Sequence, residues 1–369
     1  MKSSLFILFP LVLLLTAMAC DEPTGNNPTP DDTISGAYNP QPYNLEIPGW
    51  FPQLPATPDN PLTVDGVALG QMLFYEPLFS SDGSMSCSTC HKQEHGFTDA
   101  MPVSTGVLGM QGRRSSMSLV NLAYNTKGFF WDGRAATLED QALLPVEDHI
   151  ELNESWDNVV AKLKAHTDYP GLFRKAFGIE HKSEITKELA VKAIAQFERT
   201  MISGNSRYDK VVWQNQGFFT DEEERGRMLF FFEFAQNLDH PGCSHCHFAP
   251  FFTDNNFKNN GLDSVANLTD FADLGRGAIN SNVYDNGKFR VPSLRNIELT
   301  GPYMHDGRFA TLEEVLENYS HGGHGVSNED VNIRTFTLTQ QDKQDLIAFL
   351  KTLTDTAFIN NPQFKNPFH

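Results

Sequence analysis

Two stretches decide how this chain folds: "CSTCHKQEHGFTD" at residues 87–99 and "CSHCHFAPFFTD" at residues 243–254. Each begins with two cysteines separated by two residues, and a histidine follows the second cysteine directly. Each ends with the same three residues, Phe-Thr-Asp. The chain thus carries one unusual arrangement of two thiols and an imidazole twice, and both copies need the same explanation.

The likeness continues beyond the cysteines and keeps its order. "SLVN" at 118–121 has the counterpart "SLRN" at 293–296, and "WDGRAATLED" at 131–140 has the counterpart "HDGRFATLEE" at 305–314. Four ordered matches are not expected by chance, so we interpret the chain as two tandem homologous units. The spacing between counterparts grows along the chain, which indicates insertions in the second unit.

The segments between these motifs are predicted to be helical. Apolar residues recur on one helical face of "ITKELAVKAIAQFERTM" at 185–201 and of "TQQDKQDLIAFLKTL" at 339–353, and "TDEEERGRMLFFF" at 220–232 opens with a capping-box pattern. Alternating strand patterns are scarce. We therefore predict a mainly α fold with two tandem helical domains, at 46–219 and 220–369.

The first residues are typical of an exported lipoprotein. Lys2 precedes the apolar run "LFILFPLVLLL", and small residues then lead to Cys20. We predict a signal peptide at 1–19, lipid attachment at Cys20 to a bacterial membrane, and a periplasmic location. An ordinary signal peptide followed by an unused cysteine would leave the same trace. The residues after Cys20 are rich in Pro, Asn and Asp and bury little apolar surface, so 20–45 is predicted to be a flexible tether.

Charge limits the kinds of partner. The chain has 28 basic and 46 acidic residues, which gives a net charge of −18 at pH 7. Electrostatic repulsion therefore argues against nucleic acid as a partner. A small basic protein suits such a surface better, because opposite potentials speed encounter, although solubility alone would explain the same charge.

Four of the five cysteines belong to the repeated stretches, and none is left for a structural disulfide. A redox dithiol, a structural zinc site or a covalent c-type haem would each use such pairs. The adjacent histidine favours haem, because the sulfurs add to its vinyl groups while the imidazole binds iron. Zinc would leave both histidines unexplained. The predicted thioethers are Cys87, Cys90, Cys243 and Cys246, and the predicted iron ligands are His91 and His247.

Over about residues 60–355, the chain resembles bacterial di-haem cytochrome c peroxidases and their relatives of the MauG type. Besides both cysteine motifs, the resemblance rests on "FFWDGRAATLEDQALLPVEDHIEL" at 129–152, "AIAQFERTMISGNSRYD" at 193–209 and "VPSLRNIELTGPYMHDGRFATLEEVLENY" at 291–319. It implies two cytochrome c-like helical domains with one covalent haem each. The first haem would react with peroxide, and the second would receive electrons.

The resemblance also implies catalytic residues in the first unit. Trp131 matches a tryptophan between the haems that relays an electron or a hole. Gln141 and Glu151 match the pair above the first haem. A carboxyl group suits that place, because one positioned acid/base can both take and return a proton during peroxide cleavage.

One departure from the family concerns the first haem. Peroxidase-type members carry a histidine there as a sixth iron ligand, in the loop where this chain has Val107. Met110 or Met117 could replace it, although Met is more often core filler. We expect an open, five-coordinate first haem that needs no reductive activation.

A second departure concerns the second haem. The methionine ligand of peroxidase-type members is replaced here by Tyr319, as in the MauG type, and Met304 is the competing candidate. Aligning the two Asp-Gly-Arg turns places Pro145 opposite Tyr319, so one unit offers an oxygen ligand where the other has a ring that cannot bind iron. An anionic oxygen ligand also stabilises oxidised iron better than a thioether does.

The family also has a calcium ion between the domains. Thr300 and Pro302 match its backbone-carbonyl ligands, whereas its asparagine ligand is replaced near Ser115. Calcium is therefore an expectation from the resemblance alone.

The leading function is reduction of hydrogen peroxide to water with electrons from a small donor, a cytochrome c or a cupredoxin. One alternative is a MauG-like bis-ferryl oxidase of a protein or a small molecule. Another, from a different class, is a non-catalytic di-haem electron carrier, against which Glu151 argues. The resemblance allows a homodimer.

Overall fold

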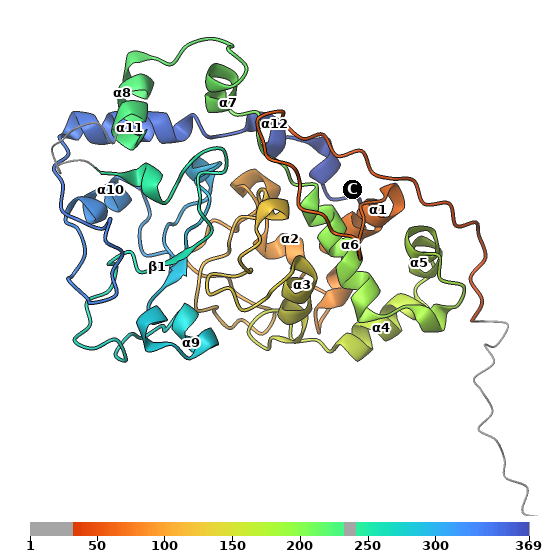
Figure 1. Ribbon diagram of the computed structural model, residues 1–369. Helices are drawn as coiled ribbons and strands as arrows, with labels where there is room; N and C mark the ends of the chain where they lie inside the picture. The colour runs from red at the N-terminus through yellow and green to blue at the C-terminus, as the bar shows by residue number, and fades with distance from the viewer. Residues whose placement is uncertain (1–31, 232–240, 369) are drawn as a thin grey trace, which may run out of the picture.

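The computed structural model describes residues 32–231 and 241–368 and is mainly helical (Figure 1). The first half contains α1 (Val64–Tyr75), α2 (Cys87–Cys90), α3 (Leu138–Glu147), α4 (Trp156–Ala165), α5 (Tyr169–Phe177) and α6 (Lys187–Arg199). The remainder contains α7 (Arg207–Val212), α8 (Asp221–Phe231), α9 (Arg276–Asn280), α10 (Leu312–Ser320), α11 (Gln340–Lys351) and α12 (Thr356–Ile359). Short 3-10 turns connect them, and the sheet in the described part has two antiparallel strands, β1 (Phe257–Lys258) and β2 (Phe289–Arg290). The prediction of a mainly α fold is confirmed.

Each half is organised around one close pair of helices. α1 packs against α6, and α8 packs against α11. At each crossing a glycine meets a backbone carbonyl: a Cβ added at Gly70 would lie 1.9 Å from the oxygen of Ala193, and one added at Gly226 would lie 1.9 Å from the oxygen of Asp345. The helices therefore approach each other more closely than any larger residue would allow.

The turns between the helices also repeat. Phe129 pairs with Ala135 in an isolated bridge, and Tyr303 pairs with Phe309 in the same way. Thr137 and Thr311 then cap α3 and α10, each with an acidic residue three positions later that completes a capping box. The two halves therefore share one sequence of turns and caps, as the sequence repeat predicts.

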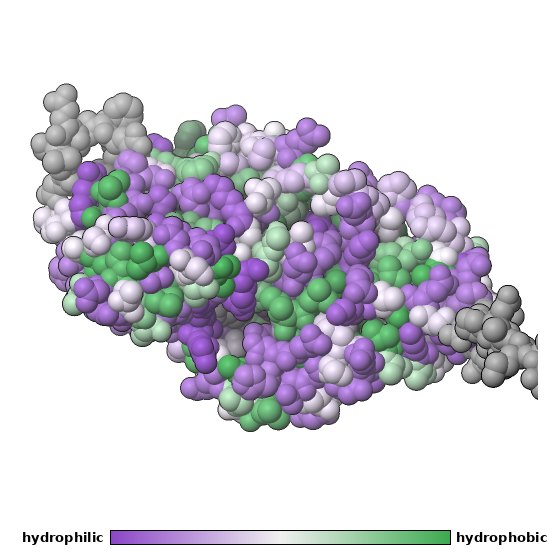
Figure 2. All heavy atoms as spheres, turned by 60° about the horizontal axis from the view of Figure 1, so that its bottom comes forward, coloured by the Kyte–Doolittle hydropathy of each residue, from purple (hydrophilic) through white to green (hydrophobic). Residues whose placement is uncertain are grey.

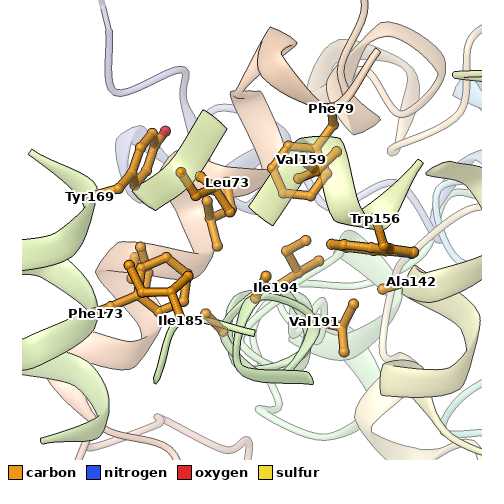
Figure 3. Packing of buried hydrophobic residues seen from close by; sticks show 14 of the residues in the cluster. Leu73, Phe79, Ala142, Trp156, Val159, Tyr169, Phe173, Ile185, Val191 and Ile194 are labelled. Carbon is orange, nitrogen blue, oxygen red and sulfur yellow. The ribbon is translucent and has the colours of Figure 1, made fainter. Parts of the chain in front are cut away.

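The core of the first half surrounds α6 (Figure 3). The ring of Phe79 meets that of Trp156 edge to face, with centroids 5.7 Å apart. Ala142 and Val146 of α3, and Leu152 just beyond it, belong to the same buried cluster. This packing fixes the turn at 148–152, which carries Glu151.

Both ends of the described chain pack on the first half. Near the N-terminus, the Ile34 amide donates to the Glu180 carbonyl. Residues 32–45 are thus docked along this half, so the tether predicted over 20–45 is not flexible throughout. Near the C-terminus, Phe358 and Phe364 pack in the core around Phe97. By its contacts the end of the predicted 220–369 domain therefore belongs to the first half.

The predicted signal peptide and Cys20 lie outside the described residues. Among the helices that are described, none is long and apolar enough to cross a membrane. Hydrophilic side chains cover most of the face shown in Figure 2, and hydrophobic ones form separate patches between them.

Candidate functional site

The first cysteine motif forms a single helical turn that presents its histidine in a fixed orientation. Cys87 to Cys90 make up α2. Nδ1 of His91 lies 2.9 Å from the carbonyl oxygen of Phe97, and because a carbonyl oxygen can only accept, Nδ1 donates. The proton then sits on Nδ1, which leaves Nε2 as the nitrogen able to bind a metal.

The second motif repeats this geometry. Nδ1 of His247 lies 3.0 Å from the carbonyl oxygen of Phe252. In both halves a serine hydroxyl donates to a backbone carbonyl in the segment that follows the histidine. Ser118 donates to Gly96 and Ser293 donates to Phe251, each at 2.6 Å. Two imidazoles are therefore held in the same way, each by a backbone carbonyl of its own motif.

The four cysteines fit covalent haem attachment better than the two alternatives. All four are free thiols, and burial raises the pKa of Cys90 and of Cys246 to about 11. Such thiols carry little thiolate at neutral pH, which makes them poor redox nucleophiles. Across the described chain, no group of three or more His, Cys, Asp or Glu side chains could hold a metal ion, so the thiols do not converge on a zinc site.

Glu151 lies in the turn after α3, where a neighbouring loop holds its backbone. The Val107 amide donates to the Glu151 carbonyl at 2.9 Å. Gly106 sits so close that an added Cβ would lie 1.8 Å from the oxygen of Ile150 and 2.7 Å from that of Glu151. In peroxidase-type members this loop would carry a sixth iron ligand. In this chain, Gly106 and Val107 of the loop pack closely against the backbone of the turn that carries Glu151.

Glu151 is close enough to the first cysteine pair for its charge to act on both thiols. Its charge contributes to the raised pKa of both Cys87 and Cys90. Burial raises the pKa of Glu151, the charge of Asp148 raises it further, and Arg134 opposes both effects. Glu151 therefore lies within electrostatic reach of the first motif.

Gln141 and Pro145 lie one helical turn apart on α3 and share a face of that helix. Met110, in the loop that packs against the Glu151 turn, is 42% exposed. The sulfur of Met117 instead accepts a hydrogen bond from Arg290 at 3.4 Å.

In the second half, the side chains of Tyr319 and Met304 both lie next to the side-chain amide of Asn260. Nδ2 of Asn260 donates to the Tyr319 hydroxyl at 3.1 Å and lies 3.6 Å from the Met304 sulfur. Burial raises the pKa of Tyr319, and the hydrogen bond from Asn260 lowers it. The charges of Cys246 and Cys243 raise this pKa further. Both candidates thus remain near the second motif, and Asn260, which sequence reasoning missed, links them.

Trp131 joins the two halves through hydrogen bonds. Its Nε1 donates to the Ser115 carbonyl at 2.9 Å, and its own carbonyl accepts from the Arg290 amide at 2.7 Å. Ser115 in turn donates through its hydroxyl to the Met304 carbonyl. The indole is 9% exposed, so it is a buried aromatic ring at the junction between the halves.

Ion pairs brace the turn that follows Trp131. Arg114 contacts Asp132 at 2.6 Å and Asp273 at 2.7 Å, and Arg276 donates to the carbonyls of Asp132 and Gly133. Sequence reasoning missed these arginines, because nothing in their local context distinguishes them from surface charges.

Thr300, Pro302 and Ser115 line one cavity of about 80 Å³, together with Arg290. Its lining offers neutral oxygens and no carboxylate, and it contains a guanidinium. Calcium prefers six to eight oxygen ligands, with carboxylates among them. These residues fit calcium poorly, so the calcium expectation gains no support from the geometry.

Comparison with known proteins shows the family to which this chain belongs. Residues 64–217 match the family described as di-haem cytochrome c peroxidase. The methylamine utilization protein MauG of Methylorubrum extorquens is 38% identical over 307 residues, which cover 82% of each chain. The cytochrome c551 peroxidase of Nitrosomonas europaea is 33% identical over 311 residues, 84% of each chain. The crystal structure of a MauG-like protein associated with microbial copper homeostasis has a TM-score of 0.82 at 34% identity and covers 89% of this chain and 100% of that one.

The fold and the paired motifs define a di-haem c-type oxidoreductase. This chain belongs to the family of bacterial di-haem cytochrome c peroxidases and MauG proteins. Relatives of both kinds match it over similar lengths, so membership alone does not choose between a peroxidase and a MauG-like oxidase.

Proposed function

We propose that this protein is a peroxidase that reduces hydrogen peroxide to water with electrons from a small redox protein. The observation that carries the proposal is the partly buried carboxyl group of Glu151, whose charge acts on Cys87 and Cys90. When bound, the two haems supply the iron that reacts with peroxide and a second centre that passes electrons. We assign the reactive centre to the first half and the electron-receiving centre to the second.

In this proposal Glu151 moves a proton between the two oxygens of peroxide. One oxygen must lose its proton when peroxide binds, and the other must gain one to leave as water. A single carboxyl group can do both when its pKa is near the working pH. Burial and the charge of Asp148 shift the pKa of Glu151 in that direction. Gln141, on the neighbouring helix, would orient peroxide through its amide.

The test is Glu151→Gln, which keeps the shape of the side chain and removes its acid/base function. We expect peroxide turnover to fall about 10²–10⁴-fold, the usual contribution of general acid–base catalysis, with unchanged haem content. Glu147→Gln is the matched control, because Glu147 is exposed at the end of α3, just before the turn that carries Glu151. Equal turnover in the Glu151 variant and this control would reject the role.

A second function, MauG-like oxidation of a protein or small-molecule substrate, is favoured by Tyr319 near the second cysteine pair. Trp131 would then share oxidising equivalents between the halves. The two functions separate when peroxide is added with a reduced cytochrome c or cupredoxin present or absent. A peroxidase turns over only with the donor, whereas a MauG-like enzyme oxidises its substrate without it. A non-catalytic electron carrier would do neither, and it leaves the partly buried Glu151 without a role.

We further propose that the protein is exported and anchored through Cys20. The N-terminal apolar run and the small residues before Cys20 support this. Cys20→Ser should move the protein from the membrane fraction to the soluble periplasm and leave haem content unchanged. Retention in the membrane fraction would contradict lipid attachment at this cysteine.

A further inference from the structure

The cavity beside Trp131 lies between the two halves and next to both histidine motifs. Residues 115–118 line it on one side and residues 290–293 line it on the other, apart from Val291. Thr98 and Thr253, which also line it, directly follow Phe97 and Phe252, whose carbonyl oxygens lie 2.9 Å and 3.0 Å from Nδ1 of His91 and of His247. Its volume of about 80 Å³ is several times what one water needs, so it has room for a small ligand group.

Arg290 is a buried cation at this cavity, and it has no anionic partner in the part of the chain that the structure describes. Its side chain is 5% exposed, and its Nε has no hydrogen-bond partner. The other two nitrogens make only long contacts, 3.3 Å to Asn255 Oδ1 and 3.4 Å to the Met117 sulfur. Burial lowers the pKa of Arg290 to about 10, which still leaves the guanidinium charged at neutral pH. Burying a charge without a partner costs several kcal/mol.

A second donor lies in the same cavity. Tyr124 lines it too, and its buried hydroxyl has no hydrogen-bond partner among the described residues. No acidic side chain is among the residues that line the cavity. A ligand that accepts hydrogen bonds and carries negative charge would satisfy both donors at once, whereas water would leave the charge of Arg290 uncompensated.

We propose that this cavity is a carboxylate-binding site, in which Arg290 and Tyr124 hold a carboxylate in place of a calcium ion. A haem propionate and a free small carboxylate offer the same chemistry. The inference rests on the presence of the two haems, but not on peroxide turnover. A divalent cation in this cavity would lie near the guanidinium with no carboxylate between them, and the two charges would repel each other.

The charge of Arg290 should also affect the reduction potentials of both haems. The guanidinium lies between the two histidine motifs, so its charge favours the reduced state of both haems. Replacing it with a neutral side chain should lower both reduction potentials. Arg227→Met is the matched control, because Arg227 pairs with Glu224 on the surface of α8, away from the cavity.

The test uses the holoprotein, with metal content and reduction potentials as readouts. We expect far less than one calcium per chain, no spectral change with the chelator EGTA, lower potentials of both haems in Arg290→Met, and a smaller shift in Arg290→Lys. Added acetate identifies the source: a saturable spectral shift that is lost in Arg290→Met indicates a free carboxylate, and no shift indicates a propionate.

One tightly bound calcium per chain, whose removal by EGTA changes the haem spectra, would overturn the proposal. Unchanged potentials in Arg290→Met would overturn it as well. If Arg290→Met does not fold, the double variant Tyr124→Phe with Arg290→Lys takes its place. This double variant removes the Tyr124 hydroxyl and replaces the guanidinium with an ammonium group, and it must still shift the reduction potentials of both haems. Loss of activity in Glu151→Gln leaves these measurements unaffected, so the two proposals fail separately.

Discussion

The helix after the Asp-Gly-Arg turn is built alike in both halves and differs at one decisive residue. α3 and α10 each begin after a threonine cap. Pro145 and Tyr319 are each the eighth residue of their helix. Tyr319 offers a hydroxyl beside the second cysteine motif, and Pro145 has nothing with which to bind iron. A repeated backbone can thus present one closed centre and one open centre through a single side chain.

A second difference accompanies the first. In the first half, the loop around Gly106 clasps the backbone of Glu151. In the second half, Asn260 holds Tyr319 and Met304. The first half therefore holds a carboxyl group near its motif, and the second half holds a phenol and a thioether near its own.

The largest expected effect comes from removing the Tyr319 hydroxyl. Tyr319→Phe should convert the low-spin ferric signal of the second haem to high-spin, or recruit Met304 as a ligand. Met304→Leu is its natural partner variant and should leave the spectrum largely intact. The reverse pattern, with Met304 controlling the low-spin signal, would place the protein with the peroxidase-type members and remove the comparison between the helices.

The second largest effect is expected from a change in the loop that packs against the turn carrying Glu151. Gly106→Ala places a Cβ against the oxygens of Ile150 and Glu151 and must displace that turn. We expect peroxide turnover to fall about tenfold to 100-fold, since small misplacements of a catalytic group have effects of this order. The pH optimum should shift as well, because the pKa of Glu151 depends on its burial. Gly112→Ala in the same loop has only ordinary contacts and should behave as wild type.

The shared helix crossing gives a test in which the halves should respond alike. Gly70→Ala and Gly226→Ala each bring a Cβ to 1.9 Å from a backbone oxygen. We expect a loss of about 3 kcal/mol in the free energy of unfolding for each, the upper end for overpacking, measured by denaturant titration. Gly171→Ala on α5 meets nothing within 4 Å and should be neutral or slightly stabilising. A large effect from only one of the crossing glycines would show that the halves are not packed alike.

The smallest expected effect is a difference between the two halves in how their stability depends on pH. Phe197 and Phe349 contact the two crossing glycines, and they are followed by Glu198 in one half and Leu350 in the other. Burial raises the pKa of Glu198 from 4.5 to about 8. The folded state therefore prefers the neutral acid, and this contribution to stability is complete below pH 4.5 and is lost as the pH rises toward 8.

Glu198→Gln should remove that loss. Relative to wild type, its melting temperature should be similar at pH 5 and higher at pH 8, because the neutral amide has no charge to bury. Leu350→Met, a volume-conserving change at the corresponding place, should show no such pH dependence. A Glu198 variant whose stability follows that of wild type across this range would contradict the raised pKa.

Sequence reasoning succeeded where one short motif fixes local chemistry. The Cys-x-x-Cys-His motifs and the tandem repeat both depend on neighbouring residues, and the structure repeats the same turns in both halves. Arg290 escaped notice because its burial depends on the meeting of two distant segments. The docking of residues 356–368 on the first half escaped it for the same reason, since no local pattern distinguishes a terminal segment that returns to the other half.

The most direct test of the account is the electron paramagnetic resonance spectrum of the resting, fully oxidised holoprotein, recorded before and after peroxide is added. The account predicts one high-spin and one low-spin ferric haem in equal amounts, because Tyr319 closes the second centre while Val107 and Pro145 leave the first one open. It also predicts that peroxide changes this spectrum without prior reduction. Two low-spin signals, unchanged by peroxide until an electron is supplied, would contradict it.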